Sequence, residues 1–354
     1  MSDKIKVGII GLGGIARGSH IPALKKRPDV EITAVCDSDE AVLNNIADEL
    51  GVRYRFSDYN DLLKIDELEV VDICTPNFLH KDPAVKALNA GKHVLVEKPI
   101  ARNAEEGAEI VDAARRSGKK LMVAYCWRWH PGARALKRFI DAGDLGDIYY
   151  ARVHALRRRG IPNWGVFTDK ERQGGGPLID IGCHLLDLTL WLMGHPKPIA
   201  ASGKCYTEFG NKPPGASKFG PWDHTKYSVE DFATGLIRFE NGATLSIESS
   251  FAANIENDSL NTVLLGNKGG CELNPLKIFT EERQTLIDIT PVNIPEVNWR
   301  EAEIFEFIDA IRDDKPVPIP GEEGLIVSKI IDAIYQSSAE NKEISIEVSE
   351  TLIV

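Results

Sequence analysis

The stretch KIKVGIIGLGGIARG, residues 4–18, decides the fold of the first part of the chain. Its first seven residues form an apolar run that is typical of a buried strand, and residues 14–26 have the pattern of a helix. Between them, GLGGIA at 11–16 fits G-x-G-x-x-A, in the strand–turn–helix context that a dinucleotide-binding turn requires. We therefore predict a dinucleotide site here; the alternative is a tight turn that binds no phosphate.

The residues of this turn have distinct expected roles. Gly11 permits the tight turn, Gly13 lets the backbone approach a pyrophosphate, and Ala16 is small enough for the helix to pack on the strand. The helix start supplies free N–H groups and partial positive charge. The cofactor contacts expected from this segment are Gly11, Gly13, Gly14 and Ile15.

An acidic residue follows the second predicted strand. EITAVCD, residues 31–37, ends at Asp37, where a carboxylate is expected to accept hydrogen bonds from the adenosine ribose. Because that carboxylate repels a 2′-phosphate, the sequence favours NAD over NADP. Ser38 beside it keeps NADP open as the less favoured cofactor.

Short apolar strands alternate with amphipathic helices up to residue 126, which indicates a parallel sheet covered on both faces. The fold class predicted for 1–126 is therefore α/β, a doubly wound Rossmann domain. The expected strands are KIKVGII, EITAVCD, VVDICTP, HVLVEKP and KKLMVAY.

The pattern changes after about residue 126. Helices are expected at 132–142, 178–193, 299–312 and 323–340, together with long alternating strands. Two of these strands flank Glu240-Asn241-Gly242, a strong hairpin signal. We predict that 127–354 is an α+β domain with an open, mostly antiparallel sheet.

Polar residues follow the third and fourth strands. Ligands of open α/β sheets bind beyond the carboxyl ends of the strands. For His80 there are two alternatives: a contact with the cofactor, or a solvated position at the start of a helix. Pro99 is expected to fix the backbone after the fourth strand, and a cis Lys98–Pro99 bond is one way to do so. The residues expected along the nicotinamide half of the cofactor are Thr75, Pro76, Asn77, Glu97 and Lys98.

A second unusual stretch is GGGPLIDIGCHLLDLTLWLMG, residues 174–194. Asp180 and His184 are four residues apart and share a helix face, and Asp187 follows three residues later. The segment is apolar nearly all round, so these polar residues need partners or a function; the alternative is an ordinary solvent face. No H-E-x-x-H or clustered His/Cys spacing is present, so no metal is predicted.

The composition of the chain argues against several classes of partner and site. The net charge of −11 over 354 residues, with no long basic run, argues against a nucleic-acid or anionic-membrane partner. The six cysteines form no C-x-x-C pair, which argues against zinc-finger and dithiol sites, and most lie in or just after apolar runs, which indicates buried, reduced thiols. With no signal peptide and no membrane-length apolar run, a cytoplasmic location is expected.

The ordered set of motifs resembles the Gfo/Idh/MocA family, which includes glucose–fructose oxidoreductase and inositol dehydrogenase. The set consists of GLGGIA, Asp37, TPN at 75–77, EKP at 97–99 and GGGPLIDIGCHLLD at 174–187. The resemblance implies that Lys98, Asp180 and His184 form the catalytic group. It also implies that the C-terminal sheet buries an interface, giving a homodimer or homotetramer.

The same resemblance suggests the substrate. RRRGIPNWGVF, residues 157–167, is similar to members that act on pyranose sugars, glycosides or inositols. Sugar or polyol contacts are expected at Arg157, Trp164 and Tyr227, besides Asp180 and His184. The segment CWRWH also matches the family, with Arg128, Trp129 and His130 facing the cofactor.

The predicted activity is hydride transfer between the nicotinamide and a secondary alcohol or ketone of such a substrate. His184 would take the hydroxyl proton, Lys98 would donate to the same oxygen, and Asp180 would orient the pair. Two alternatives remain: an NAD-dependent glycosidase that oxidises its substrate transiently, and a non-enzymatic regulator that binds a dinucleotide.

Overall fold

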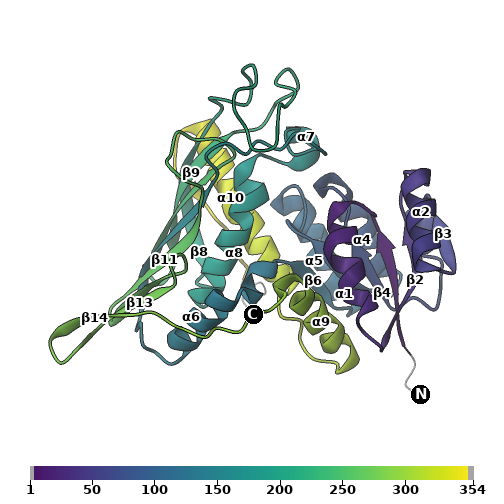
Figure 1. Ribbon diagram of the computed structural model, residues 1–354, viewed down its shortest axis with the longest axis horizontal. Helices are drawn as coiled ribbons and strands as arrows, with labels where there is room; N and C mark the ends of the chain where they lie inside the picture. Colours follow the sequence, from purple (N-terminus) through teal and green to yellow (C-terminus); the bar gives the residue numbers. More distant parts are fainter. Residues whose placement is uncertain (1–3, 350–354) are drawn as a thin grey trace. The chain divides into compact units, whose positions relative to one another are not determined.

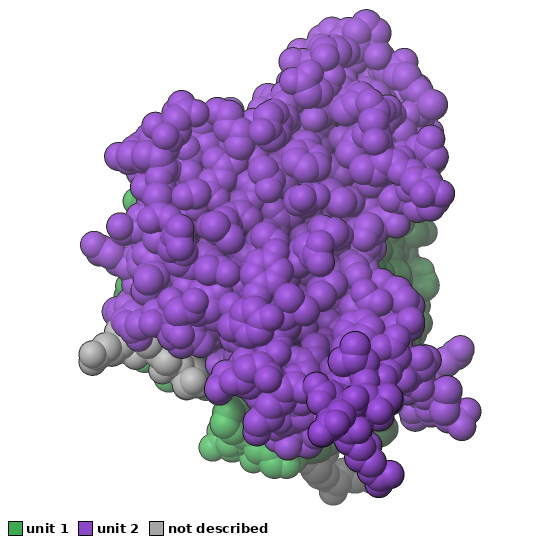
Figure 2. All heavy atoms as spheres, turned by 90° about the vertical axis from the view of Figure 1, so that its left-hand side faces the viewer, with its two compact units in different colours: residues 1–125, 298–325 green, residues 126–297, 326–354 purple. Residues whose placement is uncertain are grey.

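The structure is a computed structural model that describes residues 4–349, and these divide into two compact units (Figures 1 and 2). Unit 1, green in Figure 2, consists of the chain up to Tyr125 together with Asn298–Leu325. Unit 2, purple in Figure 2, consists of Cys126–Val297 and the chain from Ile326 onward. Each unit is described by itself.

Unit 1 is built on a six-stranded sheet in the order β3-β2-β1-β4-β5-β6, in which every neighbouring pair is parallel. This confirms the predicted doubly wound sheet, and the strand order reverses between β1 and β4. The carboxyl ends of these two strands therefore flank the switch point at which open sheets bind ligands. The strands are β1 (Ile5–Ile10), β2 (Val30–Cys36), β3 (Tyr54–Phe56), β4 (Val70–Ile73), β5 (His93–Glu97) and β6 (Leu121–Ala124).

Several helices of unit 1 begin at a residue whose side chain caps them. The Asp39 carboxylate accepts from the N–H groups of Ala41 and Val42, and the Asn103 amide oxygen accepts from that of Glu106. The helices of unit 1 are α1 (Ile21–Lys25), α2 (Glu40–Leu50), α3 (Tyr59–Leu62), α4 (Lys81–Asn89), α5 (Ala104–Ser117) and α9 (Trp299–Arg312), with short helical turns at Ala16–His20 and Asn77–Leu79.

Residues 298–325 return to unit 1, although the division at 126/127 placed them in the second domain. The Arg27 guanidinium lies 2.7 Å from Asp309, and the N–H of Val123 donates to Ile319 O over 3.2 Å. Phe307 is buried. These contacts join residues that are far apart in sequence, so the local pattern of α9 did not indicate which unit it would join.

Unit 2 contains a nine-stranded sheet in the order β14-β13-β12-β11-β7-β10-β9-β8-β15. β7 and β10 pair in parallel and the other neighbours are antiparallel, which confirms the predicted mostly antiparallel sheet. The hairpin predicted at 240–242 joins β9 to β10. The strands are β7 (Ile148–Leu156), β8 (Pro198–Tyr206), β9 (Phe232–Phe239), β10 (Thr244–Ser250), β11 (Ser259–Gly266), β12 (Gly269–Glu272), β13 (Lys277–Glu282), β14 (Thr285–Ile289) and β15 (Ile344–Ser345).

Several loops leave this sheet at one end. Leu156, the last residue of β7, pairs with Ser250, the last of β10, and with Ser259, the first of β11. Ser250 also pairs with Phe232, the first residue of β9. The connections at 157–177, 207–231 and 251–258 therefore gather there. The helices of this unit are α6 (Pro131–Asp141), α7 (Lys170–Gln173), α8 (Cys183–Leu192) and most of α10 (Gly321–Glu340), with helical turns at Cys126–Trp129 and Leu178–Gly182 (Figure 1).

Within residues 4–349, no helix is both long enough and apolar enough to cross a membrane.

Candidate functional site

The glycine turn of unit 1 has one closed side and one open side. Gly11 has φ +89°, and a Cβ on it would stand 2.8 Å from the carbonyl carbon of Cys74, so glycine is required. At Gly13 and Gly14, no heavy atom of the described chain lies within 4 Å of a Cβ position. Ala16 is buried, as expected, and Ile15 precedes the π-helical turn Ala16–His20. The open side can hold a pyrophosphate against backbone N–H groups.

Asp37 is fixed beside this turn. Its Oδ2 accepts from the N–H of Leu12 over 2.7 Å, and its Oδ1 accepts from the N–H of Asp39 over 2.9 Å. The carboxylate is thereby held at the end of β2, next to the glycines, in the place expected for a ribose contact.

His80 is fully buried, so the solvated alternative for this residue is wrong. Its Nδ1 lies 2.8 Å from Pro99 O, and its Nε2 lies 2.8 Å from Thr75 O. The ring thus joins the TPN segment after β4 to the EKP segment after β5, and burial lowers the pKa of His80.

The EKP segment is held in place by His20 and Asp72, which belong to none of the motifs. Glu97 Oε1 lies 3.1 Å from His20 Nε2, and Glu97 Oε2 accepts from the N–H of Lys98 over 3.0 Å. His20 Nδ1 lies 2.9 Å from Asp72 Oδ2. The Lys98–Pro99 bond is cis. The one signal in the sequence was Asp72, a charged residue within the buried strand VVDI.

In unit 2, Asp180 and His184 lie on one continuous helical path. A π-helical turn, Leu178–Gly182, runs directly into α8, and the backbone is right-handed helical at Pro177, Gly182 and Cys183. Asp180 is buried and His184 is half-buried. Residues four apart on such a path share a face, as predicted, and π-helical turns often occur at functional sites.

The start of this path is anchored by Glu230, which the sequence reasoning missed. Its carboxylate accepts from the N–H groups of Gly176 over 2.9 Å and Leu178 over 3.2 Å, and from the hydroxyl of Tyr335 over 2.9 Å. A Cβ on Gly176 would stand 2.1 Å from Glu230 O, which explains the glycine. Burial raises the pKa of Glu230, and these donors offset part of that rise.

Asp187 has a structural partner. The Arg128 Nε lies 2.9 Å from Asp187 Oδ2, its Nη2 lies 2.5 Å from Oδ1, and both side chains are at most 3% exposed. Burial raises the pKa of Asp187, and the guanidinium offsets part of the shift. A buried bidentate ion pair accounts for this third polar residue of the helix.

Two of the five expected sugar contacts, Arg157 and Trp164, lie together around Phe219, which the sequence reasoning did not identify. The Arg157 guanidinium lies 5.7 Å from the centre of the Phe219 ring, and the Trp164 ring lies 4.9 Å from it. Trp164 is 51% exposed, so its ring can receive a ligand.

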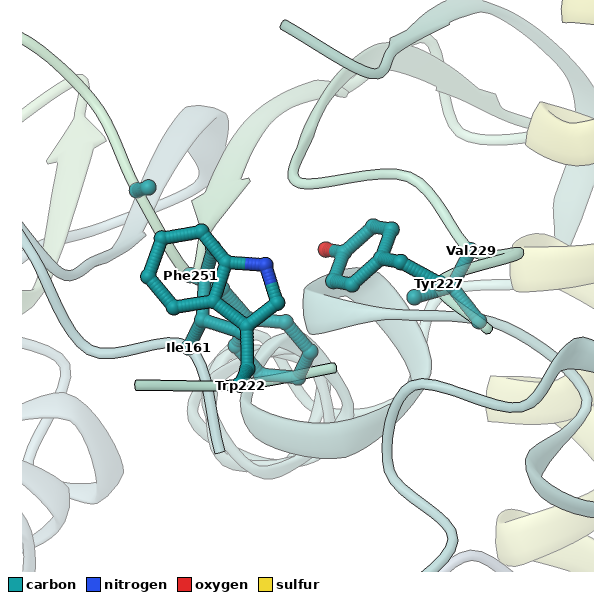
Figure 3. Packing of buried hydrophobic residues seen from close by; sticks show 6 residues of the cluster. Ile161, Trp222, Tyr227, Val229 and Phe251 are labelled. Carbon is teal, nitrogen blue, oxygen red and sulfur yellow. The ribbon is translucent and has the colours of Figure 1, made fainter. Parts of the chain in front are cut away.

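Tyr227 is placed differently. It belongs to a hydrophobic cluster with Ile161, Trp222, Val229 and Phe251 (Figure 3), and its hydroxyl donates to Glu230 O over 3.1 Å. Burial raises the pKa of this hydroxyl. The cluster supports the loop that carries Phe219, so the structure gives Tyr227 a packing role.

Comparison with known proteins identifies the family. Residues 5–125 match the family model described as "Oxidoreductase family, NAD-binding Rossmann fold", and residues 137–347 match "Oxidoreductase family, C-terminal alpha/beta domain". The chain is 37% identical to D-glucoside 3-dehydrogenase of Escherichia coli (strain K12), over 95% of this chain and 96% of that protein.

More distant relatives agree. The scyllo-inositol 2-dehydrogenase (NADP(+)) of Bacillus subtilis (strain 168) is 28% identical, over 98% of this chain and 97% of that protein. A solved structure of levoglucosan dehydrogenase in complex with NADH and levoglucosan is 25% identical, covers 98% of this chain and all of its own, and has a TM-score of 0.83. The chain therefore belongs to the Gfo/Idh/MocA family of NAD(P)-dependent oxidoreductases.

Proposed function

We propose that this oxidoreductase transfers a hydride between NAD and a secondary alcohol or ketone of a sugar, glycoside or inositol. The observation that carries the proposal is the fixed pair Asp180 and His184, on a buried helix whose first turn is anchored by Glu230. Such a pair suits proton transfer to or from a hydroxyl. Because a relative at 37% identity is named a D-glucoside 3-dehydrogenase, the 3-hydroxyl of a D-glucoside is the first substrate to test.

The cofactor proposal rests on unit 1. The open space at Gly13 and Gly14 fits a pyrophosphate, and the fixed carboxylate of Asp37 fits two ribose hydroxyls better than a 2′-phosphate. We infer that NAD is preferred and NADP is the weaker cofactor. Bound NAD supplies the hydride acceptor, and Thr75, Pro76, Asn77 and His80 are proposed to line its nicotinamide half.

Each polar residue then has one proposed task. Oxidation of an alcohol releases a hydride and a proton, and His184 takes the proton. Lys98 donates to the same oxygen and stabilises its negative charge, and Asp180 orients the pair. Arg157 and the exposed ring of Trp164 are proposed to bind the sugar, because an aromatic face and a cation suit its C–H and hydroxyl groups.

The relatives do not favour the two alternative functions. Each of the three relatives above is named a dehydrogenase, not a glycosidase or a regulator. Both Lys98 and His184 are present, as a redox enzyme requires.

A homodimer or homotetramer is also proposed, through the sheet of unit 2. Tyr206 on β8 and Leu236 on β9 are large apolar residues left 43% and 37% exposed, and the strand register places them on the same face of the sheet. Light scattering of the purified protein measures the mass directly.

The test is a panel of glucosides, aldoses and inositols with NAD⁺ or NADP⁺, followed by the absorbance of the reduced cofactor. Lys98→Ala and His184→Ala should each lower kcat by roughly 10²-fold, with NAD affinity largely kept, because acid–base assistance has that size. Lys64→Ala, at a lysine whose side chain is 75% exposed, is the matched control and should keep wild-type turnover. Near-full turnover in both site variants would contradict the assignment.

A further inference from the structure

His20 bridges two carboxylates inside unit 1. The residue ends the π-helical turn after the glycines, and it is 2% exposed. Its Nδ1 lies 2.9 Å from Asp72 Oδ2, and its Nε2 lies 3.1 Å from Glu97 Oε1. Asp72 belongs to β4 and Glu97 ends β5, which pair directly in the sheet. One imidazole therefore ties together the carboxylates of two neighbouring strands.

This geometry favours a charged ring as long as both carboxyl groups are ionised. A neutral imidazole has one N–H and can donate to only one carboxylate, so the lone pair of its other nitrogen would face the second one. An imidazolium donates to both. Burial alone would lower the pKa of His20, but Asp72 and the nearby Cys74 raise it well above its usual value.

The Glu97 carboxylate is the member of this network that contacts Lys98. Burial raises the pKa of Glu97, but the hydrogen bond and the charge of His20 outweigh burial and leave the pKa below its ordinary value. Its Oε1 is occupied by His20, and its Oε2 accepts from the N–H of Lys98 over 3.0 Å. The network therefore ends on the backbone of Lys98.

We propose that His20 is a positioning residue, held as a cation between Asp72 and Glu97, that fixes Glu97 and through it the backbone and charge environment of Lys98. The inference rests on the proposed role of Lys98 as proton donor. Glu97 thereby places a negative charge beside Lys98. That charge favours the ammonium form which the donor role requires.

Loss of the His20 cation should shift the pH dependence of turnover in a defined direction. The groups that face His20 are Asp72 on β4, Cys74 just after β4 and Glu97 on β5; Lys98 and His80 also act on Glu97. Replacing His20 with a neutral amide removes the cation, so burial then raises the pKa of Glu97. As pH falls, Glu97 gains a proton earlier than in the wild type, and turnover should decline from a higher pH.

Two variants of His20 each keep one of its two carboxylate contacts and lose the other. His20→Asn keeps a donor near the position of Nδ1, toward Asp72, and loses the contact with Glu97. His20→Gln keeps a donor near the position of Nε2, toward Glu97, and loses Asp72. Both should shift the acid limb of kcat upward in pH with NAD affinity kept, and the asparagine variant should lose more turnover, roughly tenfold at neutral pH.

His93→Asn is the matched control. His93 starts β5 at the end opposite Glu97, and its Nδ1 accepts from the N–H of Lys120 over 3.0 Å. Asparagine offers an acceptor in that place. This variant should keep the wild-type kcat and its pH dependence at and above neutral pH.

The deciding readout needs no turnover. Imidazole ¹⁵N NMR of the wild-type protein with NAD bound, assigned with His20→Gln, should show both ring nitrogens of His20 protonated from neutral to mildly alkaline pH. A neutral tautomer at neutral pH overturns the proposal. So does a bound metal found by elemental analysis, since donor atoms of His20, Asp72 and Cys74 lie within 4.8 Å of one another.

Kinetics separates positioning from mere packing. If the His20 variants lose thermal stability but keep the wild-type kcat and pH profile, His20 only packs, and the proposal fails. If instead the enzyme oxidises no sugar or polyol, or Lys98→Ala keeps full turnover, the proposed function fails, while the NMR result still decides the state of His20.

Discussion

Replacing Gly176 with alanine should displace the start of the helix that carries Asp180 and His184. The new Cβ would stand 2.1 Å from Glu230 O and 3.1 Å from Glu230 Cδ. Neither neighbour can turn away easily, because the first is backbone and the second belongs to a buried carboxylate. Restoring a normal carbon–oxygen contact requires the two segments to separate by about 1 Å.

That displacement has a calculable effect. It stretches the hydrogen bonds from Gly176 and Leu178 to Glu230, now 2.9 and 3.2 Å long. Overpacking of this kind costs about 1–3 kcal/mol of unfolding free energy. Asp180, a proposed catalytic residue, lies four residues further along, and a 1 Å error in the position of a catalytic group lowers kcat by roughly 10²-fold. NAD affinity should be unchanged, since the glycine turn belongs to unit 1.

The assay combines thermal unfolding, steady-state kinetics on the best glucoside of the panel, and NAD binding by fluorescence. Gly215→Ala is the matched control, because no heavy atom of the described chain lies within 4 Å of its Cβ position. It should behave as the wild type. Wild-type kcat and melting temperature in Gly176→Ala would refute the argument that Glu230 sets the position of the helix start.

Two further predictions concern the cofactor and the core of unit 2. Asp37→Ser should lower the preference for NAD⁺ over NADP⁺, measured as a ratio of kcat/KM values, by about tenfold or more, because the carboxylate no longer repels a 2′-phosphate; an unchanged ratio would contradict the role of Asp37. Arg128→Met should reduce the free energy of unfolding in denaturant by about 3–5 kcal/mol, because it leaves the Asp187 carboxylate buried and unpaired. The double variant Arg128→Met/Asp187→Leu should recover most of that loss, and no recovery would contradict the ion-pair argument.

The sequence predicted those parts of the fold that local patterns determine. β1, β2, β4, β5 and β6 are apolar runs bounded by polar residues, and a strand buried on both faces has that form wherever it occurs. β3 was missed because it has three residues and is only partly buried. In the site, the glycine turn and the pair on the 178–192 helix were predictable because each lies within one short stretch.

The rest of the site depends on partners far apart in sequence. His20 and Asp72 are 52 positions apart, and Gly176 and Glu230 are 54 apart. A charged residue in a buried run shows that a partner must exist, but it does not say which one. The assignment of α9 to unit 1 has the same origin, since its contacts with Arg27 become visible only in the folded chain.

The glycines of the two motifs fall into two groups, according to the atoms that a Cβ added at each position would contact. At Gly11 and Gly176, a Cβ would meet backbone from another segment, Cys74 in one case and Glu230 in the other. At Gly13 and Gly14, it would meet open space where a pyrophosphate can lie. The first pair lets two segments of the chain pack closely and so positions the strand ends or the helix start before Asp180, whereas the second pair borders the space proposed for the pyrophosphate. A side chain at Gly11 or Gly176 is therefore expected to change geometry and stability, and one at Gly13 or Gly14 is expected to weaken NAD binding.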